Sequence, residues 1–331
     1  MILRGIDFGT VCGASGVEGF FGEGYSWHRF GKLLGLDFTG MTFVGKTVTW
    51  HAREGNMDHR LVPRCIIAKP FRREPVALNV VGLTNNGAPW YFQQGKWQAR
   101  RGPFMLSFMS LAGSRGERLG ELQSFVALLQ QELPRFRAPI ALQVNVSCPN
   151  TGHAWQDQDE MVKEAILYLD LLTTLEIPIL LKVSLELDVA HAMKLHSHPA
   201  LDGICTSNTI PWRHMSDRID WDRHFGPDPV SPLAHRGFMA GGLSGAPLFP
   251  LVLEWVKAAR QAGFNKAINA GGGILRPQDA TDLLDVGADS VFIGSLAFLR
   301  PWRVATTIRA ALAWRKSHQQ VLSFSQARSS S

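Results

Sequence analysis

Short apolar runs alternate with longer amphipathic segments along most of the chain. The apolar runs contain few polar positions, which is typical of strands buried on both faces of a parallel sheet. They predict strands at residues 8–14, 41–46, 104–109, 140–146, 178–183, 202–207, 266–270 and 290–294. Between them, apolar residues at helical spacing predict helices at residues 117–133, 158–173, 248–262, 277–286 and 301–317.

This alternation of about eight strands with helices predicts an α/β fold and favours a (β/α)8 TIM barrel. A doubly wound sheet is the alternative, but it places its ligand near one reversal of strand order. Lysines, asparagines, a cysteine or glycine turns follow many of the predicted strands here, which favours the barrel. We expect one barrel domain over residues 1–323 and a disordered polar tail over residues 324–331.

Two long insertions interrupt the alternation. They cover residues 50–103 and 209–240 and follow the second and sixth predicted strands. Loops of this length at the C-terminal face of a barrel shape a binding site. The segment 211–235 carries two tryptophans and many charges, and its pattern is compatible with a partner surface or with a lid.

Composition and charge narrow the class of protein. The 331 residues are 45% hydrophobic and 19% charged, as in an ordinary globular protein. The formal net charge is +6, but the Lys and Arg residues are dispersed, so a nucleic-acid surface is only weakly indicated. The four cysteines form no CxxC pair, which disfavours a structural metal and fits a reducing compartment.

The chain also shows no sign of membrane insertion. No apolar run reaches the roughly 20 residues that a membrane span needs. Arg4 and Asp7 come too early for the apolar region of a signal peptide. We therefore expect a cytoplasmic protein that has no membrane partner.

Three glycine-rich turns lie at or just before predicted helix starts. They are GGLSG at 241–245, AGGG at 270–273 and GS at 294–295. Any one of them could be an ordinary tight turn. Together they predict a phosphate site, because glycine lets backbone N–H groups approach an anion and the loops after strands seven and eight hold phosphate in such barrels. No GxGxxG after the first strand and no GxxxxGK[ST] motif is present, which disfavours a dinucleotide fold or P-loop.

Two lysines, Lys46 and Lys182, each end an apolar strand. A buried ammonium without a partner is costly, so each needs a counterpart. One interpretation is a salt bridge at the barrel rim. The other is stabilisation of negative charge on a ligand, such as a carboxylate or a reduced flavin ring.

Four asparagines lie in the predicted mouth: Asn79, Asn145, Asn150 and Asn208. Each amide offers one acceptor and two donors without charge, which suits a planar polar heterocycle. A single asparagine at a strand end is more often part of a turn or a cap. Four of them at one mouth favour a ligand site.

Cys148 lies in the motif NVSCPNTGH, directly after a predicted strand. A free thiol has a pKa of about 8.5, so it can act as a general base if its neighbours help. The alternative is a buried thiol that only packs. A nucleophilic cysteine would need a histidine partner, and we assign no such role to the nearby His153.

The chain resembles the dihydroorotate dehydrogenases, which are FMN-containing (β/α)8 barrels of pyrimidine synthesis. The resemblance runs over nearly the whole chain and is carried by several motifs in the same order. These are GKTVTWHAREGN, NVVGLTN, NVSCPN, LLKV, TSNT, GGLSGAPL, and NAGGGI followed by IGS.

The resemblance implies a role for each matching residue. The substrate dihydroorotate would contact Lys46, Asn79, Gly82, Leu83, Asn145, Asn150, Asn208 and Thr209. FMN would contact Ala14, Ser15, Gly16, Lys46, Thr47, Asn145, Lys182, Gly245, Gly272, Gly273, Gly294 and Ser295, with the last five residues at its phosphate. Cys148 and Lys46 would be the catalytic residues. Cys148 would remove the C5 proton of dihydroorotate while a hydride leaves C6 for flavin N5.

The cysteine at position 148 resembles the soluble members of the family, since the membrane-bound, quinone-using class usually has serine there. The resemblance also implies a homodimer. Some relatives use fumarate as electron acceptor, and others reach NAD through an iron–sulfur flavoprotein partner. The sequence leaves the acceptor of this chain open.

The loop after Asn150 departs from the family pattern. Relatives continue with Pro-Gly, whereas this chain has Thr151-Gly152-His153. Two other functions therefore stay open. The protein could act on another dihydropyrimidine, including dihydrouridine in RNA, or it could bind flavin without catalysis.

Overall fold

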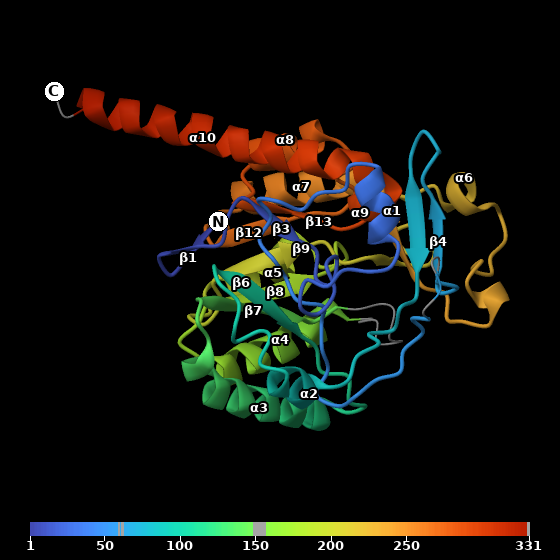
Figure 1. Ribbon diagram of the computed structural model, residues 1–331, viewed down its shortest axis with the longest axis horizontal. Coiled ribbons are helices and arrows are strands. Elements are labelled where there is room, and N and C mark those ends of the chain that lie inside the picture. The colour runs from blue at the N-terminus through green and yellow to red at the C-terminus, as the bar shows by residue number, and fades with distance from the viewer. Residues whose placement is uncertain (59, 61–62, 148–156, 330–331) are drawn as a thin grey trace.

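A computed structural model of the protein describes residues 1–329 except 59, 61–62 and 148–156 (Figure 1). Its core is a parallel sheet with the strand order β3-β13-β12-β9-β8-β7-β6. The strands are β3 (Val11–Gly13), β6 (Phe104–Phe108), β7 (Ile140–Asn145), β8 (Ile179–Val183), β9 (Gly203–Thr206), β12 (Ala267–Ala270) and β13 (Ser290–Ile293). Each lies within a predicted strand, so these seven predictions are confirmed.

The eighth position of the barrel is filled by residues 42–48 without a regular strand. Thr42 pairs with Cys12 on one side, and Val44 pairs with Met105 on the other. The Thr42 N–H donates to Val11 O at 2.8 Å, and the Gly45 N–H donates to Met105 O at 2.9 Å. The predicted strand 41–46 is therefore wrong as a strand, because its residues bond alternately to two neighbours instead of forming a ladder with either. These bonds nevertheless join β3 to β6, so the fold is a (β/α)8 barrel.

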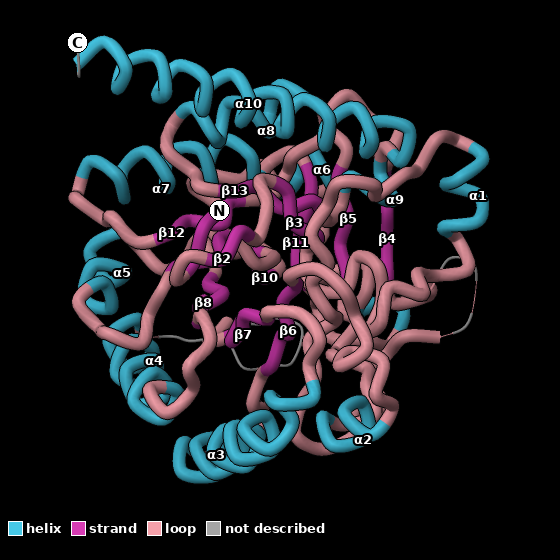
Figure 2. The backbone as a smooth tube through the Cα atoms, turned by 60° about the vertical axis from the view of Figure 1, so that its left-hand side comes forward, coloured by secondary structure: helices cyan, strands magenta, loops and turns pink. Residues whose placement is uncertain are grey.

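Helices cover the outside of the strands (Figure 2). The long ones are α3 (Arg115–Glu132), α4 (Gln158–Leu172), α5 (Val189–His196), α7 (Leu248–Gln261), α8 (Pro277–Asp285) and α10 (Val304–Ser329). Local chemistry sets where two of them begin. Ser114 and Glu117 form a capping box at α3, and the Asp157 carboxylate caps α4. Predicted helices match α3, α4, α7 and α8 closely, whereas α5 had not been predicted.

The last helix is longer than the sequence pattern indicated. α10 continues to Ser329, past residue 317 where we expected it to end. In Figure 1 its C-terminal part extends beyond the other helices. No helix in the described part of the chain is long and apolar enough to cross a membrane.

Strands within the two insertions, together with one strand directly after the second, form an antiparallel sheet with the order β10-β11-β5-β4. Its strands are β4 (Ile66–Lys69), β5 (Val76–Asn79), β10 (Ile210–Pro211) and β11 (Gly242–Gly245). Asn79 at the end of β5 pairs with Gly242 of β11. The sequence pattern showed β4, β5 and β10 only as parts of long loops, and it predicted a glycine-rich turn at 241–245, where β11 lies instead. The sheet fixes residues of both insertions relative to each other at the barrel mouth.

Short helices complete the connections: α1 (His28–Leu33), α2 (Ala88–Gln93), α6 (Trp221–Phe225), α9 (Leu296–Leu299) and 3-10 turns at Leu133–Arg135, Ala234–Arg236 and Pro301–Arg303. In segment 211–235, Trp221 is buried and its ring centroid lies 5.0 Å from that of Trp212. The Trp212 indole donates to Pro229 O at 2.9 Å. The two tryptophans therefore hold this segment together.

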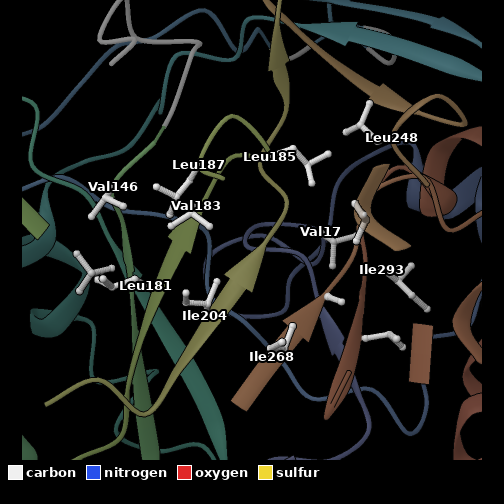
Figure 3. Close-up of a cluster of buried hydrophobic side chains, with 14 of the residues drawn as sticks. Val17, Val146, Leu181, Val183, Leu185, Leu187, Ile204, Leu248, Ile268 and Ile293 are labelled. Atoms are coloured by element: carbon white, nitrogen blue, oxygen red, sulfur yellow. The ribbon is translucent and has the colours of Figure 1, made fainter. Parts of the chain in front are cut away.

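The strands separate two apolar clusters. Leu180 packs inside the barrel with Met105, Cys205 and Phe292, one residue from each of several strands. Its neighbour Leu181 belongs to the larger cluster between strands and helices, part of which Figure 3 shows. Side chains alternate in this way because successive residues of a strand point to opposite faces.

The amino-terminal hairpin packs against the inner cluster. β1 (Ile2–Leu3) and β2 (Ile6–Asp7) pair antiparallel, and Met1, Leu3 and Phe8 join the side chains inside the barrel. The barrel interior is thus a packed core. Space for a ligand lies beyond it, at the carboxyl ends of the strands.

Candidate active site

A cavity of about 280 Å³ lies at the carboxyl ends of the strands. That volume is near the lower end of the roughly 300–1,000 Å³ typical of small-molecule sites. Sixteen of the predicted site residues line it: Ala14, Ser15, Gly16, Lys46, Thr47, Asn79, Gly82, Leu83, Asn145, Lys182, Asn208, Thr209, Gly272, Gly273, Gly294 and Ser295. Gly245 is not among the lining residues, although its neighbour Ser244 is. Cys148 and Asn150 lie outside the described residues, so the structure does not place them.

Lys46 is buried at this mouth. Only 8% of the residue is exposed, and its ammonium donates to Thr84 O at 2.9 Å. Burial lowers the pKa of this ammonium to about 8, although Cys65 and Glu23 act in the opposite direction. The group is therefore charged below pH 8 and loses its charge above it. Among the described residues no carboxylate forms a salt bridge with Lys46, so the rim salt bridge considered for it is not observed.

Lys182 lies on β8 between Asn145 of β7 and Cys205 of β9. It shares the strand face of Leu180, which points into the barrel, so its side chain reaches toward the mouth. No salt bridge joins it to a carboxylate in the described ranges. Both lysines thus bring positive charge to one cavity. Lys182 comes from β8, and Lys46 comes from the segment that joins β3 to β6.

Two asparagines form a hydrogen-bonded pair within the cavity wall. The Asn208 amide donates to Asn145 Oδ1 at 3.1 Å and also to the Ser147 carbonyl. The Ser147 N–H donates to Asn145 Oδ1 at 3.2 Å, and the Thr209 N–H donates to Asn208 Oδ1 at 3.1 Å. Because both side chains are buried and bonded, their orientation is fixed before a ligand arrives.

Asn79, Gly82 and Leu83 come to the mouth through the antiparallel sheet. Asn79 ends β5, and the next residues turn back across the cavity. Leu83 has a φ of 57°, and Arg53 Nε holds this turn by donating to Gly82 O at 2.7 Å. The hydrogen bond from Arg53 therefore fixes this turn as part of the cavity wall.

A chain of hydroxyls connects two further predicted residues. Ser15 Oγ lies 2.8 Å from Thr47 Oγ1, which in turn lies 2.8 Å from Ser107 Oγ. Ser15 also donates to Gly45 O at 2.9 Å. These bonds fix the loop after β3 against residues 45–47, next to Lys46.

Gly272, Gly273 and Gly294, from two of the three predicted glycine turns, line the other side of the cavity. A Cβ on Gly273 would lie 2.6 Å from both Gly245 O and Phe249 N, and a Cβ on Gly245 would lie 2.4 Å from Pro75 O. In the described structure, the N–H groups of Gly272, Gly273, Gly294 and Ser295 have no hydrogen-bond partner. Bare backbone with open N–H groups fits a phosphate. The residues present therefore fit FMN.

Several residues of the cavity were missed by sequence reasoning: Val17, Tyr25, Trp27, Met57, Ile66, Val81, Ser207, Ser244, Leu248, Ile274, Phe292 and Phe298. Tyr25 donates to Gly16 O at 2.8 Å, and the Trp27 ring meets Phe298 edge-on at 6.1 Å. Most of these come from loops, where no periodicity signals a position. The density of aromatic residues in segment 20–27 was the one available signal.

Open N–H groups, two lysines and bonded amides at the mouth of a (β/α)8 barrel are features that fit an anionic, phosphate-bearing ligand. The family model for dihydroorotate dehydrogenase matches residues 3–314. The chain therefore belongs to the dihydroorotate dehydrogenase family, whose members are flavin-dependent oxidoreductases. The resemblance and the enzyme class predicted from the sequence are confirmed.

Individual relatives agree with the family match. The catalytic subunit of a dihydroorotate dehydrogenase B (NAD(+)) from Thermodesulfovibrio yellowstonii is 25% identical over 86% of this chain and 84% of that protein. A dihydroorotate dehydrogenase A (fumarate) from Lactobacillus delbrueckii is 28% identical over 89% of this chain and 86% of that protein. A crystal structure of a ligand-free DHODH from Eimeria tenella has a TM-score of 0.64 at 19% identity, covering 94% of this chain and 86% of that one. The last comparison supports the fold.

Proposed function

We propose that this protein oxidises dihydroorotate to orotate in pyrimidine biosynthesis, with FMN as its cofactor. One observation carries the proposal. The buried ammonium of Lys46, which has no carboxylate partner among the described residues, shares a cavity with the bonded pair Asn145 and Asn208. The ammonium can pair with a carboxylate, and the neighbouring amides can bond the polar edge of a ring. Together they match a pyrimidine that carries a carboxylate.

The chain's own residues would bind and orient the two ligands. Asn79, Asn145 and Asn208 would hold the ring, with Thr209 and the turn at 82–83, and Lys46 would hold the carboxylate. The open N–H groups at 272–273 and 294–295 would hold the FMN phosphate, and Lys182 would face the flavin ring. The chemistry that FMN supplies when bound is acceptance of the hydride from C6 at its N5 atom.

Cys148 is proposed as the base that takes the C5 proton. Its support is its place in the sequence, three residues after Asn145 at the end of β7, and the family resemblance. The oxidation then balances, since the substrate loses a proton from C5 and a hydride from C6. Replacing the thiol should stop turnover without removing the cofactor.

Flavin spectroscopy tests this function. The purified protein should be yellow, and anaerobic dihydroorotate should bleach the flavin band. Cys148→Ala should keep the band and slow bleaching by roughly 10²–10⁴-fold, the usual contribution of a general base. Bleaching at the wild-type rate in Cys148→Ala would refute the assignment of the base, and a protein that never bleaches would refute the substrate.

The same assay addresses the open alternatives. Dihydrouracil and a dihydrouridine-containing tRNA should leave the flavin oxidised, and reduction by either one instead of dihydroorotate would favour that substrate. Reoxidation by fumarate, or by NAD with and without a candidate iron–sulfur flavoprotein, then identifies the acceptor. Sedimentation of the same sample tests the proposed homodimer.

A further inference from the structure

The Lys46 ammonium has an unusual set of neighbours for a buried cation. It donates to one carbonyl, Thr84 O, and lies 4.8 Å from the centre of the Phe20 ring. The titratable groups whose charge reaches it are Glu23 and Cys65. Neither forms a salt bridge with it in the described structure. The aromatic face is therefore a main source of electrostatic compensation for the buried charge.

The Phe20 ring is held on several sides. It stacks on Tyr91 with a centroid distance of 4.3 Å and an interplanar angle of 24°. The Trp97 indole donates to Phe20 O at 2.7 Å, and the Lys46 N–H donates to Gly19 O at 3.0 Å. The loop that carries the ring is thus bonded both to the first insertion, through Trp97, and to the backbone of Lys46.

Glu23 is a carboxylate whose charge reaches Lys46, yet its oxygens are engaged elsewhere. Its two oxygens accept from the N–H groups of Phe20 at 3.0 Å and Phe21 at 2.7 Å. The carboxylate therefore closes the loop and supports the ring. A direct ion pair with the ammonium would instead compete with an anionic substrate for the same charge.

We propose that Phe20 is a positioning residue for Lys46: its ring holds the buried ammonium toward the cavity and stabilises its charge while leaving it free to bind an anion. The proposal deepens the proposed function and rests on it, since it assigns Lys46 to the substrate carboxylate. An ammonium held by a ring and a single carbonyl keeps N–H donors for the ligand.

Substrate-free labelling of Lys46 tests the proposal. Competitive acetylation by acetic anhydride, read by peptide mass spectrometry across pH 6 to 11, gives the titration midpoint of this one lysine. In Phe20→Leu the midpoint should fall by about 0.5 to 1.5 pH units, because the ring no longer stabilises the charged form. Fluorinated phenylalanines at position 20 keep the shape but weaken the ring face, so they should lower the midpoint progressively even if Phe20→Leu folds poorly.

Phe21→Leu is the matched control. Phe21 lies in the same loop, 5.6 Å from the Tyr91 ring, and its own face carries Lys96 at 4.9 Å. This variant should leave the Lys46 midpoint unchanged. An equal shift in Phe20→Leu and Phe21→Leu, or no shift in the fluorinated series, would overturn the proposal and leave the loop a purely structural role.

Activity gives a second readout. The alkaline limb of kcat/KM for dihydroorotate should move to lower pH with the Lys46 midpoint in Phe20→Leu, and Phe20→Tyr should restore it. Since labelling needs no substrate, the two proposals can fail separately. A shifted midpoint in a protein that does not oxidise dihydroorotate would refute the function alone.

Discussion

Gly273 occupies a position at the mouth where a side chain would collide with backbone. Its φ is 78°, and an added Cβ would lie 2.6 Å from Gly245 O and from Phe249 N. Backbone atoms at that distance cannot move aside as the end of a flexible side chain can. The residue combines a left-handed conformation with a close approach, and both require glycine.

Gly273→Ala should therefore weaken FMN binding at least tenfold and lower the melting temperature. The control is Gly120→Ala in α3, where an added Cβ meets nothing within 4 Å. That change should raise stability by about 0.5–1 kcal/mol, because alanine is the better helix residue. Flavin fluorescence titration and thermal melts measure both effects. Unchanged FMN affinity in Gly273→Ala would contradict the role of this turn.

Single residues also show what sequence reading could reach in the site. Lys46, Asn145 and Asn208 were found because they follow apolar strands with unexpected polarity. Trp27 lies in a loop and Phe298 in a four-residue helix, and both were missed because neither segment is long enough to show a periodic signal. The depressed pKa of Lys46 was also beyond prediction, because it arises from burial by distant parts of the chain.

At the scale of elements, α3 and α4 are joined by a buried ion pair. Arg118 Nε donates to Glu164 Oε1 at 2.6 Å, and Arg118 Nη2 donates to Glu164 Oε2 at 2.6 Å. Tyr168 adds a bond to the same carboxylate at 3.0 Å. The pair lies close to the end of β7, since Arg118, Glu164 and Asn145 line one small cavity.

Glu164→Ala should destabilise the protein by about 3–5 kcal/mol, because it removes the buried carboxylate that accepts two hydrogen bonds from the Arg118 guanidinium. Replacing both residues, Arg118→Met with Glu164→Leu, should recover most of that loss. Lys163→Ala, which removes only the exposed pair with Glu160, should cost less than about 1 kcal/mol. Urea unfolding curves compare the variants. An equal loss of unfolding free energy in Glu164→Ala and Lys163→Ala would show that the buried pair stabilises the protein no more than the exposed one.

The helices were predicted far better than the insertion strands. Ser114 and Asp157 mark the starts of α3 and α4 within a few residues, so local patterns identify them. β5 and β11 are each four residues long and pair across a long stretch of chain, as Asn79 does with Gly242. No local pattern encodes that partnership, which depends on how the barrel brings two insertions together.

For the whole molecule, stability and chemistry lie at opposite ends of the barrel. Phe8 is fully buried among Met1, Leu3 and the residues inside the strands. The cavity lies at the other end, where the strands finish. Because of this separation, we expect that a substitution around Phe8 leaves the residues that line the cavity in place.

Phe8→Ala should lower the free energy of unfolding by about 3–5 kcal/mol through the cavity it leaves. FMN affinity and the rate of flavin reduction, measured well below the melting temperature, should change less than twofold. Calorimetry and stopped-flow reduction give the two quantities. A large loss of FMN affinity at unchanged stability would show that the two ends of the barrel are coupled.

The sequence by itself determined the (β/α)8 pattern, most of the helices and the polar residues that end the strands. These are local properties, since burial on both faces and helical periodicity leave their mark within a few residues. Only the tertiary structure decided how residues 42–48 close the barrel, how two insertions pair into one sheet, and how Phe20 comes to lie against Lys46. Those features depend on contacts between distant segments, and such contacts exist only once the chain has folded.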